Sequence, residues 1–220
     1  MWQGLAAAPG IAIGPAAVLK KTTGDLEQTG PAAEPQEEEA RLTAAVEAVR
    51  RELTALKERT EREVGAEQAA IFGAHLLMLD DPALVGETRR LIREEKLAAP
   101  AALTRVVDDL AAVLDALPDE YLRERAADVR DVGGRLLAEL TGARTEVVLP
   151  APAVVVGADL TPSQTAQLPK DKLLALLSGT GGRTAHVAIL ARSLGIPAVV
   201  GLGERLSTVR DGDLVAVDGT

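Results

Sequence analysis

The segment from Thr180 to His186 combines residue types that can bind an anion and carry it covalently. The chain has two histidines, and one of them, His186, follows the glycine pair Gly181 and Gly182. Adjacent glycines let the backbone turn sharply and approach a ligand closely, because they have no Cβ atom. A neutral imidazole beside such a turn can attack phosphorus, and the N–P bond that forms stays reactive enough to be passed on. The segment therefore indicates covalent phosphoryl transfer as its chemistry.

The residues between the glycines and His186 suit the same chemistry. The apolar run at 173–177 predicts a strand before the glycines, and the apolar spacing after them predicts a helix that ends at Gly195. Free N–H groups at a helix start favour an anion. Thr184 is placed to cap this helix, and Arg183 is placed to meet phosphoryl oxygens.

A plainer interpretation of the same residues is also open. Gly181 and Gly182 would then form an ordinary tight turn, and His186 would be a half-buried helix residue without a chemical role. A glycine pair followed by a histidine is a short and weakly specific motif. These few residues alone leave both interpretations standing.

The middle of the chain predicts a set of helices. From residue 37 onward, apolar residues recur at steps of three and four among dense charges, which is typical of amphipathic helices. The first two helices are expected to end at Gly65 and at the Asp80-Asp81-Pro82 sequence, and the last at Gly142. Consecutive helices joined by short links indicate a bundle.

Strand-like segments lie on both sides of this predicted bundle. They are short runs rich in apolar residues, and they cover residues 6–19, 147–149, 154–156, 173–177, 196–200 and 214–217. The opening segment has no strand partner within the bundle, so we expect it to join the later α/β unit. The predicted fold is α/β plus all-α, with a discontinuous α/β domain (1–21 and 143–220) and an inserted linker and helical bundle (22–142).

Composition and charge exclude several classes of protein. The chain of 220 residues has no cysteine, which excludes disulfides, thiolate metal sites and cysteine nucleophiles. No segment approaches the roughly 20 apolar residues that span a bilayer, and none resembles a signal peptide, so we expect a cytoplasmic protein without membrane contact. A formal charge of −9 argues against nucleic-acid binding and favours a basic partner, although it also serves solubility alone.

Longer motifs resemble the phosphoenolpyruvate-utilising enzymes. Residues 181–201 (GGRTAHVAILARSLGIPAVVG) closely resemble the phosphohistidine signature of that family. Three further segments resemble Enzyme I of the bacterial sugar phosphotransferase system, namely residues 8–14 (APGIAIG), 121–131 (YLRERAADVRD) and 159–168 (DLTPSQTAQL). The resemblance covers essentially the whole chain.

This resemblance implies a role for each residue of the site. His186 would accept a phosphoryl group on Nε2 from phosphoenolpyruvate and pass it to the small carrier protein HPr. Thr165 would orient the imidazole through the other ring nitrogen; without the resemblance it would be a turn or capping residue. Relatives usually have serine where Ala185 stands, so any hydrogen bond from that hydroxyl is absent here. The implied fold is a phosphohistidine swivelling domain with β/β/α layers and an inserted HPr-binding helical bundle.

The resemblance also implies partners and a metal outside this chain. Phosphoenolpyruvate and Mg²⁺ would bind a carboxy-terminal domain that follows residue 220, and the main contacts of a homodimer would lie there too. No cofactor or metal is expected in this chain. We therefore do not expect phosphoenolpyruvate alone to phosphorylate it.

The second predicted helix is implied to dock HPr. Glu67, Ile71, His75 and Met78 are spaced by four, four and three residues, which places them along one helical face. A face of this kind suits a basic patch around an apolar centre. From spacing alone, Ile71 and Met78 would equally be bundle core and Glu67 a solvated charge.

Three charged residues extend this expected docking face. Asp80 and Asp81 would steer a basic partner by long-range attraction. Arg125 matches an arginine near the family's docking groove, and its plainer role is a surface ion pair of small energetic value.

Two other functions remain alternatives. One is the related swivelling phosphohistidine domain of a dikinase or synthase, from which the inserted bundle and the 8–14 start distinguish Enzyme I. The other is a helical interaction module without catalysis, which would leave the glycine pair, Thr165 and His186 without a purpose.

Overall fold

The computed structural model describes residues 2–19, 33–143, 149–182 and 186–220. The chain divides into two compact units. The first, here called the sheet unit, comprises Met1–Lys21, Thr60–Gln68 and Glu146–Thr220; the second, the helical unit, comprises Thr22–Arg59 and Ala69–Thr145. Residues 60–68 were expected in the bundle, whereas their contacts group them with the sheet unit. Each unit is described by itself.

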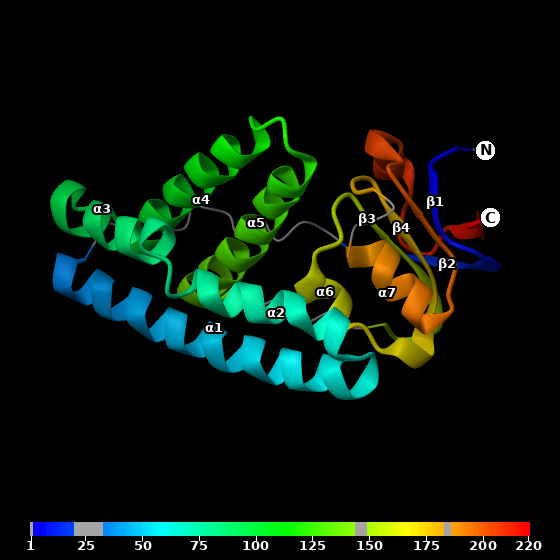
Figure 1. The fold of residues 1–220 in the computed structure, drawn as a ribbon, viewed down its shortest axis with the longest axis horizontal. Coiled ribbons are helices and arrows are strands. Elements are labelled where there is room, and N and C mark those ends of the chain that lie inside the picture. The colour runs from blue at the N-terminus through cyan, green and yellow to red at the C-terminus, as the bar shows by residue number, and fades with distance from the viewer. Residues whose placement is uncertain (1, 20–32, 144–148, 183–185) are drawn as a thin grey trace. The chain divides into compact units, whose positions relative to one another are not determined.

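The sheet unit is built on a six-stranded mixed sheet with the order β1-β5-β4-β3-β2-β6. Figure 1 labels four of these strands, β1 to β4. The strands are β1 (Leu5–Ala8), β2 (Ile11–Leu19), β3 (Ala153–Gly157), β4 (Leu173–Ser178), β5 (Ala198–Val200) and β6 (Leu214–Asp218). Strands β2 to β5 are parallel, while β1 and β6 add antiparallel edges. The opening segment thus pairs with later strands, which confirms that expectation. The strand expected at 147–149 lies outside the described residues except for Leu149.

Both faces of the parallel strands are covered, and β3 shows this most clearly. Val154, Val155 and Val156 are each at most 1% exposed, although neighbouring residues of a strand point to opposite faces. Val155 belongs to the core beneath the helices α6 (Pro162–Gln167) and α7 (His186–Leu194). Its two neighbours pack on the other face with residues from the η4 turn (Gly203–Thr208). This explains the unbroken apolar runs of β3 and β4.

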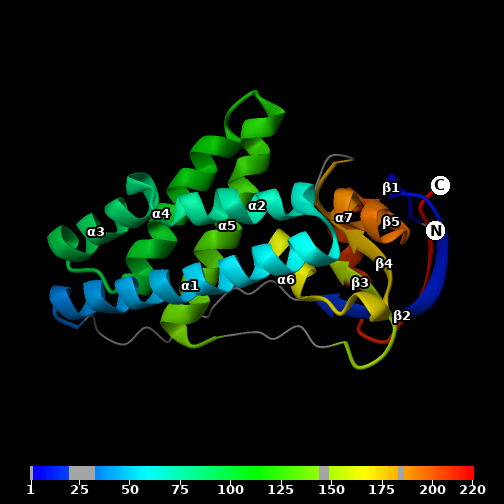
Figure 2. The same cartoon turned by 60° about the horizontal axis from the view of Figure 1, so that its bottom comes forward.

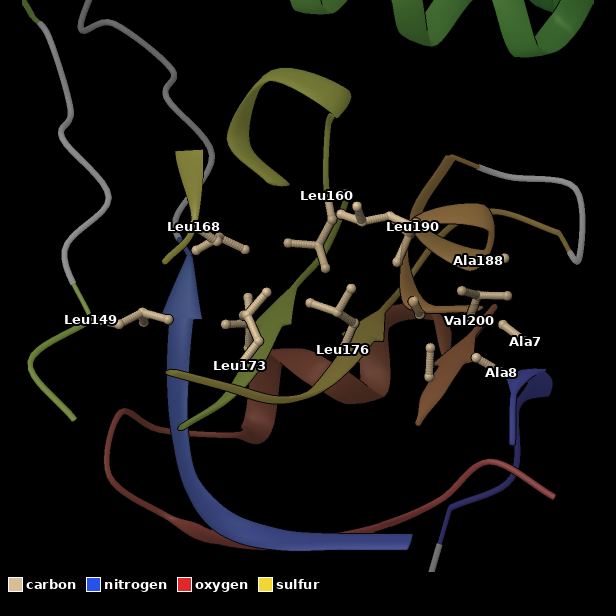
Figure 3. Packing of buried hydrophobic residues seen from close by; sticks show 14 residues of the cluster. Ala7, Ala8, Leu149, Leu160, Leu168, Leu173, Leu176, Ala188, Leu190 and Val200 are labelled. Carbon is tan, nitrogen blue, oxygen red and sulfur yellow. The ribbon is translucent and has the colours of Figure 1, made fainter. Parts of the chain in front are cut away.

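Helix α7 is fixed to the sheet by one apolar face and one polar contact. Val187, Ala188, Leu190 and Ala191 are buried in the core that Figure 3 shows between the helix and the strands. At the end of the helix, Arg192 donates a hydrogen bond to the carbonyl of Ala7 in β1 at 2.8 Å. These contacts fix the position of α7, and so of its first turn, relative to the sheet.

The helical unit consists of packed helices, as the apolar spacing predicts. They are α1 (Pro35–Glu63), α2 (Ala66–Met78), α3 (Glu87–Glu95), α4 (Ala99–Asp115) and α5 (Glu120–Thr141), with a π-helical turn, η2 (Pro82–Gly86), before α3. The end of α1 and the start of α2 belong to the sheet unit. Helix α1 runs beside α2 in both views, and α4 packs on α5 (Figures 1 and 2). The expected ends hold: Gly65 and Gly142 have positive φ, and α2 stops before Pro82.

No single helix within the described ranges is long and apolar enough to cross a membrane, and one bent pair, Ala66–Met78 with Pro82–Glu95, passes that test by length and composition only.

Candidate functional site

His186 is the first residue of helix α7, in the connection that leads on from β4. This is the strand, turn and helix order that the sequence predicts. The residue is partly exposed rather than enclosed by the aliphatic core beneath α7. Arg183, Thr184 and Ala185 lie outside the described residues, so the expected phosphoryl contact of Arg183 and cap by Thr184 stay predictions.

The glycines before His186 differ in what they require. Gly181 has φ +94°, a conformation that residues with a Cβ rarely adopt. A Cβ on Gly182 would meet nothing within 4 Å, so space around it is open. The turn therefore depends on Gly181 for its backbone conformation, whereas Gly182 leaves room beside the start of α7.

A third glycine, Gly179, holds the strand ends together. A Cβ there would lie 2.7 Å from the carbonyl oxygen of Ala158 and 3.1 Å from that of Gly203, both backbone atoms that cannot move aside cheaply. The N–H of Gly179 donates to Gly157, and its carbonyl accepts from Gly203 at 2.9 Å. This glycine is not among the residues predicted for the site; its place at the end of an apolar strand is the signal by which the sequence could have identified it.

Thr165 lies in α6, the short helix that packs beside α7. The helix starts with a reciprocal cap, in which Thr161 accepts from the N–H of Gln164 and the Gln164 side chain accepts from the N–H of Thr161. Thr165 is 2% exposed, and its hydroxyl lies 2.9 Å from the carbonyl oxygen of Thr161 and 3.0 Å from that of Pro162. A hydroxyl has one proton, so these carbonyls engage it as a donor and leave its lone pairs as acceptors.

The expectation of an exposed His75 is wrong. His75 is 0% exposed, and its ring lies at right angles to that of Phe72 with centroids 6.0 Å apart. Its Nε2 is 3.4 Å from Asp128 Oδ1, and its Nδ1 is 3.9 Å from Asp131 Oδ2, beyond hydrogen-bond distance. The cause is the rotation of α2 about its axis, because the buried residues of this helix and of the turn after it are Ala69, Phe72, His75 and Leu79.

The other expected docking residues of α2 are at least partly exposed. Glu67 is exposed in the first turn, and Ile71 and Met78 are partly buried. Leu77, which is not among the predicted docking residues, is 73% exposed. It lies off the buried helical face, which a residue-by-residue projection of α2 could have revealed.

The three charged residues that were predicted to extend the docking face all have hydrogen-bond partners within the chain. Asp80 accepts two hydrogen bonds from Arg50, at 2.7 and 3.2 Å, and this guanidinium lowers the pKa of the Asp80 carboxyl. Asp81 accepts from the N–H of Ala83 at 2.8 Å and so caps the η2 turn. Arg125 donates to Asp128 at 3.0 Å. Both aspartates remain exposed, so their charge still contributes to the field outside the protein.

Among the described residues, no group of three or more histidine, aspartate or glutamate side chains is arranged to hold a metal ion.

Two family models match the chain. The amino-terminal model of the PEP-utilising enzymes matches residues 3–125, and the mobile-domain model of the same enzymes matches residues 149–220. The second match contains β3 to β6, Thr165 and His186, so it covers the site described above.

Curated and solved relatives agree with these matches. Phosphoenolpyruvate-protein phosphotransferases of Staphylococcus aureus and Streptococcus equinus are 40% and 42% identical over 99% and 100% of the chain. The chain spans 38% of the length of each. A solution structure of Enzyme I is 43% identical, with a TM-score of 0.73 over all of this chain and 90% of that one. The amino-terminal domain of a nitrogen Enzyme I is 32% identical, with a TM-score of 0.63. The chain therefore belongs to the PEP-utilising enzymes and, within them, to the Enzyme I group of phosphoenolpyruvate-protein phosphotransferases.

Proposed function

We propose that this chain carries a phosphoryl group on His186 and exchanges it with the phosphocarrier HPr. The observation that carries the proposal is the position of the imidazole: it starts a helix, follows a turn that requires glycine, and is partly exposed beside α6. A helix start stabilises the negative charge of a phosphoryl group through its free N–H groups. Partial exposure lets donor and acceptor reach the ring.

Thr165 supports the proposal through its hydrogen-bonding state. Because its proton is engaged by the carbonyls of Thr161 and Pro162, its oxygen can only accept from an imidazole. An acceptor facing Nδ1 keeps the proton on that nitrogen and leaves the Nε2 lone pair free to attack phosphorus. We infer that Thr165 selects this tautomer of His186.

We place the HPr contact on the helical unit, around the exposed end of α2. Leu77 and Met78 supply apolar contact there, and Asp80 and Asp81 supply negative charge. The net charge of −9 favours encounter with a basic carrier. His75 acts from the interior, where it packs on Phe72 and lies near Asp128, the partner of Arg125.

We further propose that the phosphoryl group originates from phosphoenolpyruvate. In the whole protein, a carboxy-terminal domain would bind phosphoenolpyruvate with Mg²⁺ and mediate dimerisation, and the sheet unit would act as the swivelling phosphohistidine domain. Cytoplasmic location follows from the same proposal, since HPr and phosphoenolpyruvate are cytoplasmic in this scheme.

The test is transfer from phosphorylated HPr to the chain, followed by mapping of the labelled residue. We expect acid-labile phosphate on His186 and none on the His186→Gln variant. Only two histidines exist, so peptide mapping decides between His186 and His75. Label on His75, or no label from a donor that phosphorylates an authentic Enzyme I fragment, would reject the function.

A further inference from the structure

The loops after β3 and β4 are joined by a side-chain hydrogen bond that the function proposed above does not use. The hydroxyl of Thr180 donates to Oδ1 of Asp159 at 2.8 Å. Thr180 directly precedes Gly181 in the turn that leads to His186. Asp159 stands two residues before Thr161, the cap of the helix that carries Thr165. The bond therefore ties the loop of the nucleophile to the loop of its proposed orienting residue.

Backbone contacts place the two loops side by side as far as Thr180. The N–H groups of Gly179 and Thr180 donate to the carbonyls of Gly157 and Ala158, which extends the pairing of β3 and β4 past the strand ends. After Thr180, Gly181 has the conformational freedom of a residue without Cβ, and a Cβ at Gly182 would meet open space. Thr180 is thus the last residue before the glycines that is tied to the α6 side.

A fixed separation matters because the proposed transfer depends on ring orientation. The tautomer selected by Thr165 is maintained only while α6 and the start of α7 keep their spacing, and small misplacements of reacting groups can cost up to about 100-fold in rate. Exposed threonine and partly exposed aspartate side chains are not required for core packing, so a local positioning role explains them better than global stability.

We propose that Asp159 and Thr180 form a positioning pair that holds the loop of His186 at a fixed distance from α6 during phosphoryl transfer. This inference rests on the proposed function. Neither residue touches the phosphoryl group; both act through the geometry of His186 and Thr165.

The experiment measures single-turnover transfer from phosphorylated HPr as a function of HPr concentration. For Thr180→Val we expect the maximal rate to fall about tenfold, with the half-saturating HPr concentration unchanged, because docking is proposed on the helical unit. Thr180→Ser keeps the hydroxyl and should restore most of the rate. Asp159→Ala should match Thr180→Val, while Asp159→Asn keeps an acceptor oxygen and should stay near the wild type.

The double variant provides the decisive comparison. Because the two residues act through one bond, Thr180→Val combined with Asp159→Ala should be no slower than either single variant. Wild-type rates in Thr180→Val, or losses that multiply in the double variant, would overturn the pair while leaving the proposed function intact. Absence of label on His186 in the wild type would instead overturn the proposed function, and the pair with it. Thermal melting of each variant separates a slower folded protein from a partly unfolded one.

Discussion

At the residue scale, the site depends on a few side chains and on the absence of others. In the proposed function, His186 would supply the reactive group and Thr165 the orienting group. Gly179 allows a close backbone approach, and Gly181 allows the turn after β4. These contributions differ in kind. A glycine that is required for its conformation can be distinguished experimentally from one that is not.

Gly181→Ala and Gly182→Ala form a matched pair for that purpose. At φ +94°, an alanine at 181 costs about 1–3 kcal/mol in local strain, so the turn is expected to shift and His186 phosphorylation to slow at least tenfold. A methyl group at 182 meets nothing within 4 Å, so that variant should retain most of its rate. The rate of phosphoryl transfer from phosphorylated HPr to His186 is measured for both variants. Equal losses in the two variants would show that backbone strain is not the controlling factor.

The sequence predicts the order of elements around His186 well, because that order is local, and it predicts poorly which helical face turns inward. The strand, glycine turn and histidine order around His186 is contiguous, so short-range rules identify it. His75 belongs to a helix whose inward face is decided by what packs on it. Phe72, His75 and Leu79 share that face, and spacing alone did not show that a histidine would take a core position.

At the element scale, the helical unit is held together by polar contacts between helices as well as by its core. Glu38 of α1 is 1% exposed, and it accepts from the N–H of Ala99 at 2.7 Å. It therefore caps α4 from a neighbouring helix, because Ala98 at the cap position offers no side-chain acceptor. Such long-range caps are not visible in a local sequence window.

Glu38→Gln is expected to weaken the helical unit in a pH-dependent way. Burial acts to raise the pKa of Glu38, but hydrogen bonds from Ala99, Ala33 and Arg41 outweigh it, so the pKa lies below its usual 4.5. A lowered folded-state pKa contributes stability above the unfolded-state pKa and loses it as pH falls through the folded-state value. Urea unfolding should show a deficit of about 1–3 kcal/mol at neutral pH that shrinks below about pH 4.5. A deficit independent of pH would contradict this.

At the scale of the whole molecule, the chain divides into two compact units, and it passes between them more than once. The general division into helices and a mixed sheet follows from the change in apolar period along the sequence. The assignment of residues 60–68 to the sheet unit cannot be predicted from that period. It depends on the tertiary contacts of the segment where α1 ends and α2 begins. Likewise, sheet order cannot be read from strand patterns that all look alike.

Two compact units predict two separable unfolding transitions. The single tryptophan, Trp2, reports on the sheet unit, whereas far-ultraviolet circular dichroism is dominated by the helices. In Gly133→Ala, the new Cβ would lie 2.4 Å from Val107 Cγ2 between α4 and α5, so the dichroism transition should lose about 1–3 kcal/mol while the fluorescence transition stays in place.

Gly134→Ala is the control for that experiment. Nothing lies within 4 Å of its added Cβ, so it should leave the helical unit unchanged or stabilise it by up to about 1 kcal/mol. If the unfolding transitions followed by fluorescence and by circular dichroism shift together in Gly133→Ala, the two units unfold as one cooperative unit.

The pairing of β2 with β6 has a consequence for how the protein is made. Ile11 lies opposite Asp218, so β2 acquires this edge partner only after the whole segment between the two strands, including the helices, has been synthesised. The helices in between have mostly nearby partners and can fold first, as domains generally do during synthesis. Their folding brings the two distant strand segments closer together and lowers the entropic cost of joining them. The nascent chain is therefore expected to pass through a stage with a formed bundle and an unfinished sheet.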